Sequence, residues 1–292
     1  MSQPMIALLG LGVTVCMVFG GYLLAGGKLS IILHSLPFEM MMIGGAATGA
    51  FLAANDFTTI KHVGSDLLAL VKGPKWKKQD YQELLCLMHE LLGVLRESPV
   101  DIEAHIEDPQ SSSIFSQYPK IQKDHDAADM ICDTIRSMIM NFDNAYQVEE
   151  MLEKQLDQRR EDSLHGAHAL SNVADALPAL GIVAAVLGVI KTMASIDKPP
   201  EVLGQMIGGA LVGTFLGVFL AYGMVGPFAA RVKSLREEEH NFYGLIREVL
   251  VSSLHAHPAP ICVEVGRRNA PHKVRPSFQE MDDAIRALKK VA

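Results

Sequence analysis

Acidic side chains inside apolar segments are the residues of this sequence best suited to ion chemistry. The candidates are Glu39 and Asp175. An ionisable group at membrane depth is costly and typically marks an ion or proton pathway. We expect both residues near the ends of their segments, within reach of headgroups or water, so the chain is predicted to lack a mid-membrane carboxylate. If the protein conducts ions, the titrating group should then belong to a partner.

Histidines offer a second chemistry, a metal site in a membrane enzyme. His165 and His168 lie three residues apart on a predicted helix, and His255 and His257 lie in a loop. No glutamate stands at the spacing of the HExxH metalloprotease motif, and no Ser or Cys nucleophile elbow occurs. The four cysteines lack CxxC spacing and are expected to be free thiols. We predict no enzyme activity, metal or cofactor, and a metal-dependent membrane enzyme remains the alternative from another class.

The elements that must position these residues follow from segregated charge. The 292 residues are 49% hydrophobic, yet residues 1–27, 176–190 and 202–230 contain no Asp, Glu, Lys or Arg, and 29–55 contain only Glu39. A helix needs about 20 residues to cross a hydrocarbon layer of about 30 Å. The sequence therefore predicts an all-α membrane protein whose four transmembrane helices cover roughly 3–25, 36–54, 172–193 and 201–230. A transmembrane barrel is excluded because alternating ten-residue segments are absent.

Basic flanks orient these spans. Lysines cluster at 61–78 after the second span, and basic residues cluster at 231–236 after the fourth. Because such flanks stay in the cytoplasm, both termini are predicted to be cytoplasmic. The net charge of −7 argues against nucleic acid as a partner. The predicted parts are transmembrane helices 1 and 2 (1–55), a large helical cytoplasmic insert (56–170), transmembrane helices 3 and 4 (171–230) and a helical cytoplasmic C-terminal tail (231–292).

The insert and tail carry helical patterns. Apolar residues from Leu84 to Leu95 recur on one helix face, and further helices are predicted at 124–141 and 146–168. No proline or turn cluster separates the 146–168 helix from Ser171, so it is expected to continue into the third span. Ser277 and Glu280 form a capping-box pattern that predicts a last short helix.

Small residues and prolines mark the spans. Pro178 and Pro227 lie inside the third and fourth spans toward the cytoplasmic side, where each produces a kink or a hinge. Thr214 lies mid-span, either on an ion path or bonded back to its own helix. Glycines at helix-packing intervals predict close packing within one subunit and in a homo-oligomer. These glycines are Gly45, Gly49, Gly181, Gly188, Gly209, Gly213 and Gly217.

Several stretches resemble, in order, the MotA family of flagellar motor stator subunits, part of the MotA/TolQ/ExbB proton channel family. The resemblance covers almost the whole chain and implies a stator subunit of the bacterial flagellar motor in the inner membrane. The stretches that carry it are 175–188, 211–217, 221–227, 106–109, 260–267 and 275–278.

This resemblance also implies partners. Several copies of the four-span subunit would ring two copies of a single-span partner of the MotB type, whose aspartate carries the ion, while the insert contacts the rotor protein FliG. By position, the rotor-facing residues would be Arg96, Glu103 and Glu107. The spacing from arginine to glutamate is one residue shorter than the family pattern, and Pro99 lies between them.

The resemblance further implies that Pro178 and Pro227 couple ion flow to torque, and that Ala185 and Thr214 lie on the ion path. Ala185 stands where sodium-type members tend to have threonine. Its methyl group offers no oxygen to a dehydrated sodium ion, so the transported ion is predicted to be the proton. The rival within the class is an ExbB/TolQ-type proton-channel subunit that energises outer-membrane processes. Such subunits resemble three-span proteins, whereas the apolar stretches 1–27 and 29–55 favour four spans.

Overall fold

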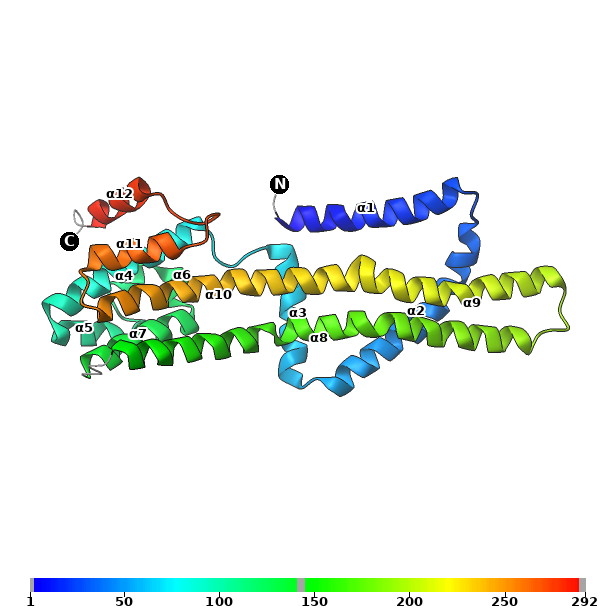
Figure 1. Cartoon of the computed structure of the whole chain (residues 1–292), viewed down its shortest axis with the longest axis horizontal. Helices are drawn as coiled ribbons and strands as arrows, with labels where there is room; N and C mark the ends of the chain where they lie inside the picture. Colours follow the sequence, from blue (N-terminus) through cyan, green and yellow to red (C-terminus); the bar gives the residue numbers. More distant parts are fainter. Residues whose placement is uncertain (1–2, 141–144, 289–292) are drawn as a thin grey trace. The chain divides into compact units, whose positions relative to one another are not determined.

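The computed structural model describes residues 3–140 and 145–288. Within these ranges all regular structure is helical, and no strand occurs (Figure 1). The prediction of an all-α fold is confirmed.

Four helical segments of the described residues are long and apolar enough to cross a membrane. The first two are α1 (Gln3–Leu24) and α2 (Leu29–Ala54), and the third is part of α8 (Ala145–Met193). The fourth begins as α9 (Pro200–Leu220), passes through a π-helical turn at Ala221–Val225 and continues as α10 (Gly226–Leu254). The predicted run of one helix into the third span is confirmed, because α8 extends unbroken over 49 residues.

The second span begins earlier than predicted. A turn with Gly26 at φ 82° leads directly into α2 at Leu29, and Pro37 lies inside the helix. A start near residue 36 would have placed this proline in the first turn, where its missing N–H costs nothing. Membrane helices tolerate internal proline because neighbouring groups satisfy the freed backbone. As a result Glu39 lies about 15 Å from the start of α2, at 1.5 Å per residue.

The chain forms two compact units. The first combines the residues up to Gly73 with Ser163–Leu235, and we call it the span unit. The second, the insert unit, combines Pro74–Asp162 with the residues from Arg236 onward. Helix α3 (Phe57–Lys72) and residues 163–170 thus cluster with the apolar helices, although the sequence division assigned them to the insert. Which residues lie in the membrane and which in the cytoplasm stays a prediction.

The insert unit has its own apolar core. The predicted face of α4 (Lys78–Glu97) is buried, with Leu84, Leu85 and Leu91 fully enclosed. Trp76 stacks on Phe242 of α10 with ring centroids 3.9 Å apart. The other helices of the unit are α5 (Pro99–Ile106), α6 (Pro119–Gln122), α7 (His125–Ile139), α11 (Ala259–Asn269) and α12 (Phe278–Leu288).

The predicted capping box at the start of α12 is confirmed. The Glu280 backbone N–H donates to Ser277 Oγ at 3.1 Å, and the Ser277 N–H donates to Glu280 Oε2 at 2.6 Å. These bonds satisfy backbone donors that the first helical turn leaves unpaired.

Candidate functional site

Helices α8 and α9 are in backbone contact within the span unit. A Cβ added to Gly181 would lie 2.8 Å from the carbonyl oxygen of Gly213, and one added to Gly188 would lie 2.6 Å from Ala210 Cβ. Only glycine permits such an approach, so the predicted packing of the third and fourth spans is confirmed within one chain. On α2, by contrast, a Cβ at Gly45 or Gly49 would meet nothing within 4 Å.

The glycines of α9 also make room for polar side chains of α2. A Cβ at Gly209 would lie 2.8 Å from Ser35 Oγ, and one at Gly213 would lie 2.6 Å from Glu39 Oε2. Glu39 is only 5% exposed, and within the described part of the chain its Oε2 has no hydrogen-bond partner. The expectation that Glu39 lies near the end of its segment is therefore wrong, because the residue lies well inside α2 and borders a cavity between helices. Because α2 begins at Leu29, Glu39 lies in the middle part of the helix, where α9 covers it.

The backbone segments that carry Ala185 and Thr214 meet at the same place. A Cβ at Gly213 would lie 3.2 Å from the backbone nitrogen of Ala185, and Thr214 is the next residue. The predicted ion-path positions therefore lie at the level of Glu39. Thr14, Thr48 and Thr192 each donate to the carbonyl four residues earlier, at 3.0, 2.8 and 2.9 Å. The structure records no such bond for the half-buried Thr214 within the ranges it describes.

A cavity of about 500 Å³ opens beside Glu39. It lies where α2, α8 and α9 meet, and its wall combines apolar residues with five polar or charged side chains besides Glu39. They are His34, Ser35, Lys191, Thr192 and Gln205. A wall of this composition suits water and small ions.

The two predicted hinge prolines differ in their local structure. Pro178 lies inside α8 without interrupting the helix. Pro227 follows the π-helical turn at Ala221–Val225, with Gly226 between them, and sequence reasoning missed this turn. A proline ring clashes with the carbonyl four residues earlier, and a π turn widens the backbone spiral and relieves that clash. Proline after a small-residue stretch (Ala221, Gly223) is the signal that could have indicated it.

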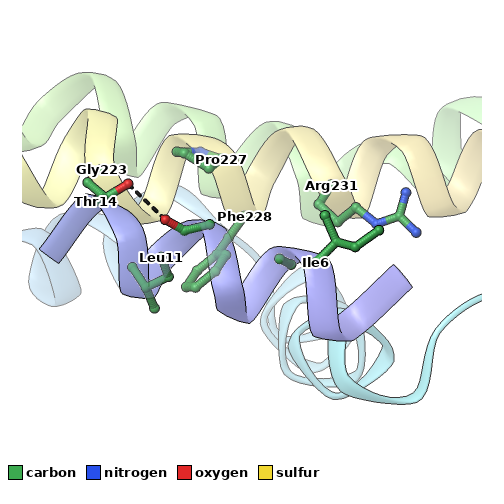
Figure 2. A pocket seen from close by; sticks show the side chains of 9 residues that line it. Ile6, Leu11, Thr14, Gly223, Pro227, Phe228 and Arg231 are labelled. Atoms are coloured by element: carbon green, nitrogen blue, oxygen red, sulfur yellow. Dashed lines mark hydrogen bonds between the residues drawn. The ribbon is translucent and has the colours of Figure 1, made fainter. Parts of the chain in front are cut away.

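Empty space lies beside Pro227. A groove of about 530 Å³ separates α1 from the segment around Pro227. Figure 2 shows Phe228 reaching toward α1, with Leu11 and Thr14 on the opposite wall. The Thr14 hydroxyl donates to the Gly10 carbonyl and not to the hinge segment. At Gly223 the segment does approach α1, because a Cβ there would lie 3.5 Å from Thr14 Cγ2, whereas the groove leaves space on this side of Pro227.

The predicted rotor-facing residues lie on the surface of the insert unit. Arg96, in the last turn of α4, and Glu103, on α5, are both exposed. Pro99 does not disrupt this region, because it is the first residue of α5. The Ser98 hydroxyl caps that helix by accepting from the Asp101 N–H at 3.2 Å.

Glu107 is held in an ion pair. Arg136 of α7 donates from Nε to Glu107 Oε1 at 2.9 Å and from Nη1 to Asp133 at 2.6 Å. Arg136 is thus a residue of this charged surface that sequence reasoning missed. The only sequence signal was its spacing of three residues from Asp133, which is typical of a helical ion pair.

The charged residues of the stretch 260–267 have a structural role. Arg267 donates to both carboxylate oxygens of Glu264 at 2.7 and 2.8 Å, and also to the Pro276 carbonyl at 3.1 Å. The hydrogen bond from Arg267 lowers the pKa of Glu264 to about 2. Arg275 donates to the Ala270 carbonyl at 2.9 Å. These bonds fix the connection between α11 and α12.

The histidines of the alternative metal site do not form one cluster. His165 and His168 are exposed on α8 in the span unit, whereas His255 and His257 belong to the insert unit. Over residues 3–140 and 145–288, no group of three or more His, Cys, Asp or Glu side chains is arranged to hold a metal ion. The four cysteines are free, and only Cys16 is exposed.

Two family models match the sequence. Residues 8–99 match the family described as motility protein A N-terminal, and residues 122–243 match the MotA/TolQ/ExbB proton channel family. Motility protein A of Salmonella typhimurium is 36% identical over 286 residues, which cover 98% of this chain and 96% of the relative. The chemotaxis protein LafT of Vibrio parahaemolyticus is 33% identical over 273 residues, which cover 93% and 95%.

Solved structures share the fold. The structure of C. jejuni MotAB matches with a TM-score of 0.71 at 18% identity, covering 93% of this chain and 98% of the matched chain. The flagellar MotAB stator complex from Bacillus subtilis matches with a TM-score of 0.66 at 22% identity, covering 88% and 92%.

Proposed function

Because the chain belongs to the MotA/TolQ/ExbB proton channel family, and within it to motility protein A, it is a stator subunit of the bacterial flagellar motor, and we propose how it works. Several copies surround a single-span partner of the MotB type. Proton flow past the partner's aspartate changes the packing of the apolar helices, and the insert unit pushes on the rotor protein FliG. The subunit lies in the inner membrane with both termini in the cytoplasm.

The observation that carries this proposal is the continuity of α8 and α10. Each helix contributes residues to both the span unit and the insert unit. Each also carries one proline, Pro178 or Pro227, within its apolar part. A change of packing around Ala185 and Thr214 therefore acts on helices that themselves enter the insert unit, and local weakening at proline gives them a place to bend.

Protons are proposed as the transported ion. Ala185 presents a methyl group where an oxygen ligand would favour sodium, a hard cation that prefers oxygen. The match of residues 8–99 to the motility protein A N-terminal family, together with four apolar helices, favours this role over an ExbB/TolQ-type subunit.

Rotor contact is proposed at the exposed α5 surface, with Glu103 as its main charge and Arg96, in the last turn of the preceding helix α4, as a second charge. Glu107 is less available, because Arg136 already neutralises it. An exposed charge contributes little to folding but strongly affects the recognition of an oppositely charged partner.

The test is complementation in a bacterium that lacks its own motility protein A, with this chain expressed beside its cognate MotB-type partner. Wild type is expected to restore swimming. Glu103→Lys is expected to reduce swimming while membrane level and co-purification with the partner stay unchanged. The matched control is Asp129→Lys, the same charge change at an exposed position on α7.

Charge reversals on the rotor protein are expected to restore part of the swimming lost in Glu103→Lys. If no rotor substitution modifies the defect, the contact at Glu103 is wrong. If the wild-type pair restores no rotation, the coupling mechanism proposed for this chain is wrong.

A further inference from the structure

We infer that Glu39 is a proton-binding carboxyl of this chain, loaded through the cavity at the meeting point of α2, α8 and α9. Its part in the motor rests on the proposed function, whereas its protonation does not. The chain thereby contributes a titrating group to the ion path in addition to the aspartate of its partner.

The first support is the burial of one carboxyl oxygen without a partner. Glu39 is 5% exposed, and its Oε2 has no hydrogen-bond partner within the described ranges. Buried carboxylates in proteins are normally paired or hydrogen-bonded, because loss of hydration disfavours the charge. A buried, unpartnered oxygen is instead suited to holding a proton.

The second support is the space made for this side chain. Oε2 faces α9 at Gly213, where a Cβ would come within 2.6 Å of it. Four residues earlier on each helix, Ser35 Oγ faces Gly209 in the same way, 2.8 Å from where a Cβ would lie. Two polar side chains of α2 therefore pack against two glycines of α9. Close packing of the two backbones alone would not require polar atoms at these two positions.

The third support is access. Glu39 lines the cavity of about 500 Å³, which is large enough to hold several waters. The titratable groups that share its wall are His34 from α2 and Lys191 from α8, while α9 contributes the amide Gln205 and otherwise apolar residues. Lys191 lies near the end of α8, and the α9 residues of the wall lie near the start of α9. The cavity therefore lies toward the α8–α9 connection, which is predicted to be external.

The chemical step is a simple proton exchange. A hydronium ion in the cavity transfers a proton to the Glu39 carboxylate, which leaves water and a neutral carboxyl, and the reverse step returns the proton. Glu39 lies at the level of Ala185 and Thr214, because Gly213 approaches both the Ala185 backbone and the Glu39 carboxyl. Loading at this level places a proton beside the proposed ion path.

Protonation is tested by infrared difference spectroscopy of the full chain with its partner in lipid vesicles, titrated in H₂O and D₂O. Wild type is expected to show the carbonyl stretch of a protonated carboxyl that titrates with pH and shifts in D₂O. The part of this absorption that comes from Glu39 is expected to disappear in Glu39→Gln, which preserves side-chain size, while the other carboxyls of the chain and the partner's aspartate still absorb. It is expected to persist in Glu201→Gln, the matched control at an exposed position on α9, and to persist with a changed frequency in Glu39→Asp.

Two spectroscopic outcomes overturn the inference. One is a Glu39→Gln spectrum that equals the wild-type spectrum at every pH. The other is a wild-type spectrum without any exchanging carboxyl. Glu39→Asp decides the question if Glu39→Gln fails to fold, because an unchanged band frequency in Glu39→Asp assigns the band elsewhere.

The role in the motor is tested by single-motor speed against external pH. Motor speed is expected to decline as external pH rises and protons become scarce. In Glu39→Gln this decline is expected to begin at a lower external pH than in wild type, while Glu201→Gln follows wild type. An unchanged pH profile in Glu39→Gln overturns the role on the ion path. Wild-type motors that fail to turn contradict the proposed function instead, and leave the spectroscopic result standing.

Discussion

Substitution of Gly181 by alanine tests whether backbone contact between α8 and α9 stabilises the span unit. The new Cβ would lie 2.8 Å from the Gly213 carbonyl oxygen and 3.0 Å from Gly217 Cα. Both are backbone atoms, so no side chain can rotate away, and the helices must separate by several tenths of an ångström. The separation loosens every contact along the pair.

The magnitude follows from two opposing effects. Replacing glycine by alanine inside a helix ordinarily stabilises it by about 1 kcal/mol. Overpacking a tight interior costs about 1–3 kcal/mol. The cost at Gly181 is expected toward the upper end, because the atoms that the new Cβ meets belong to the backbone and cannot rotate away. We therefore expect Gly181→Ala to lower the free energy of unfolding by roughly 1–2 kcal/mol.

Gly204→Ala is the matched control, because Gly204 lies on α9 of the same helix pair and a Cβ there would meet nothing within 4 Å. It is expected to be neutral or slightly stabilising. The assay is unfolding of the purified protein in detergent, followed by circular dichroism and by the monodisperse peak in size exclusion. If Gly181→Ala is as stable as Gly204→Ala, the close backbone contact at Gly181 does not contribute to the free energy of unfolding as argued.

Three further predictions concern bending, capping and pH. Pro178→Ala and Pro227→Ala are expected to leave expression and partner co-purification intact but to lower single-motor speed sharply, since each restores a rigid helix; normal speed in both variants would make the prolines packing kinks. Ser98→Ala removes the cap of α5 and is expected to destabilise the insert unit by about 1 kcal/mol, measured by denaturation, with Ser98→Asp as the rescuing control. Burial opposes ionisation of Asp124, yet hydrogen bonds led by that from Lys75 hold the pKa of Asp124 below its ordinary value of 3.8, so its stabilisation is complete above that value and is lost as pH falls through the folded-state pKa. Thermal stability is expected to decline below about pH 4, and a Lys75→Met variant that declines as steeply as wild type would contradict this reasoning.

Several features were predictable from the sequence because they depend on local pattern. The absence of charge over residues 176–190 and 202–230 predicted membrane helices, since apolar length alone decides whether a helix can span the bilayer. The face of α4 and the capping box at Ser277 followed from helical spacing. The family resemblance rested on several stretches that occur in the same order as in the family, and the comparisons confirm it.

Other features depend on where helices meet, which spacing does not encode. The pairing of Glu107, the cap at the end of α5, with Arg136 of α7 joins two different helices. The start of α2 also depends on its neighbours: it includes Pro37 because a membrane helix has neighbours to compensate a missing hydrogen bond.

Glu39 shows the difference most clearly. The sequence by itself determined that one carboxylate lies in the second apolar segment, because charge is visible residue by residue. Only the tertiary structure decided that this carboxyl is buried, faces Gly213 and lines a cavity. The physical reason is that hydration depends on which helix covers a side chain, and that cover comes from α9, more than 160 residues later in the chain.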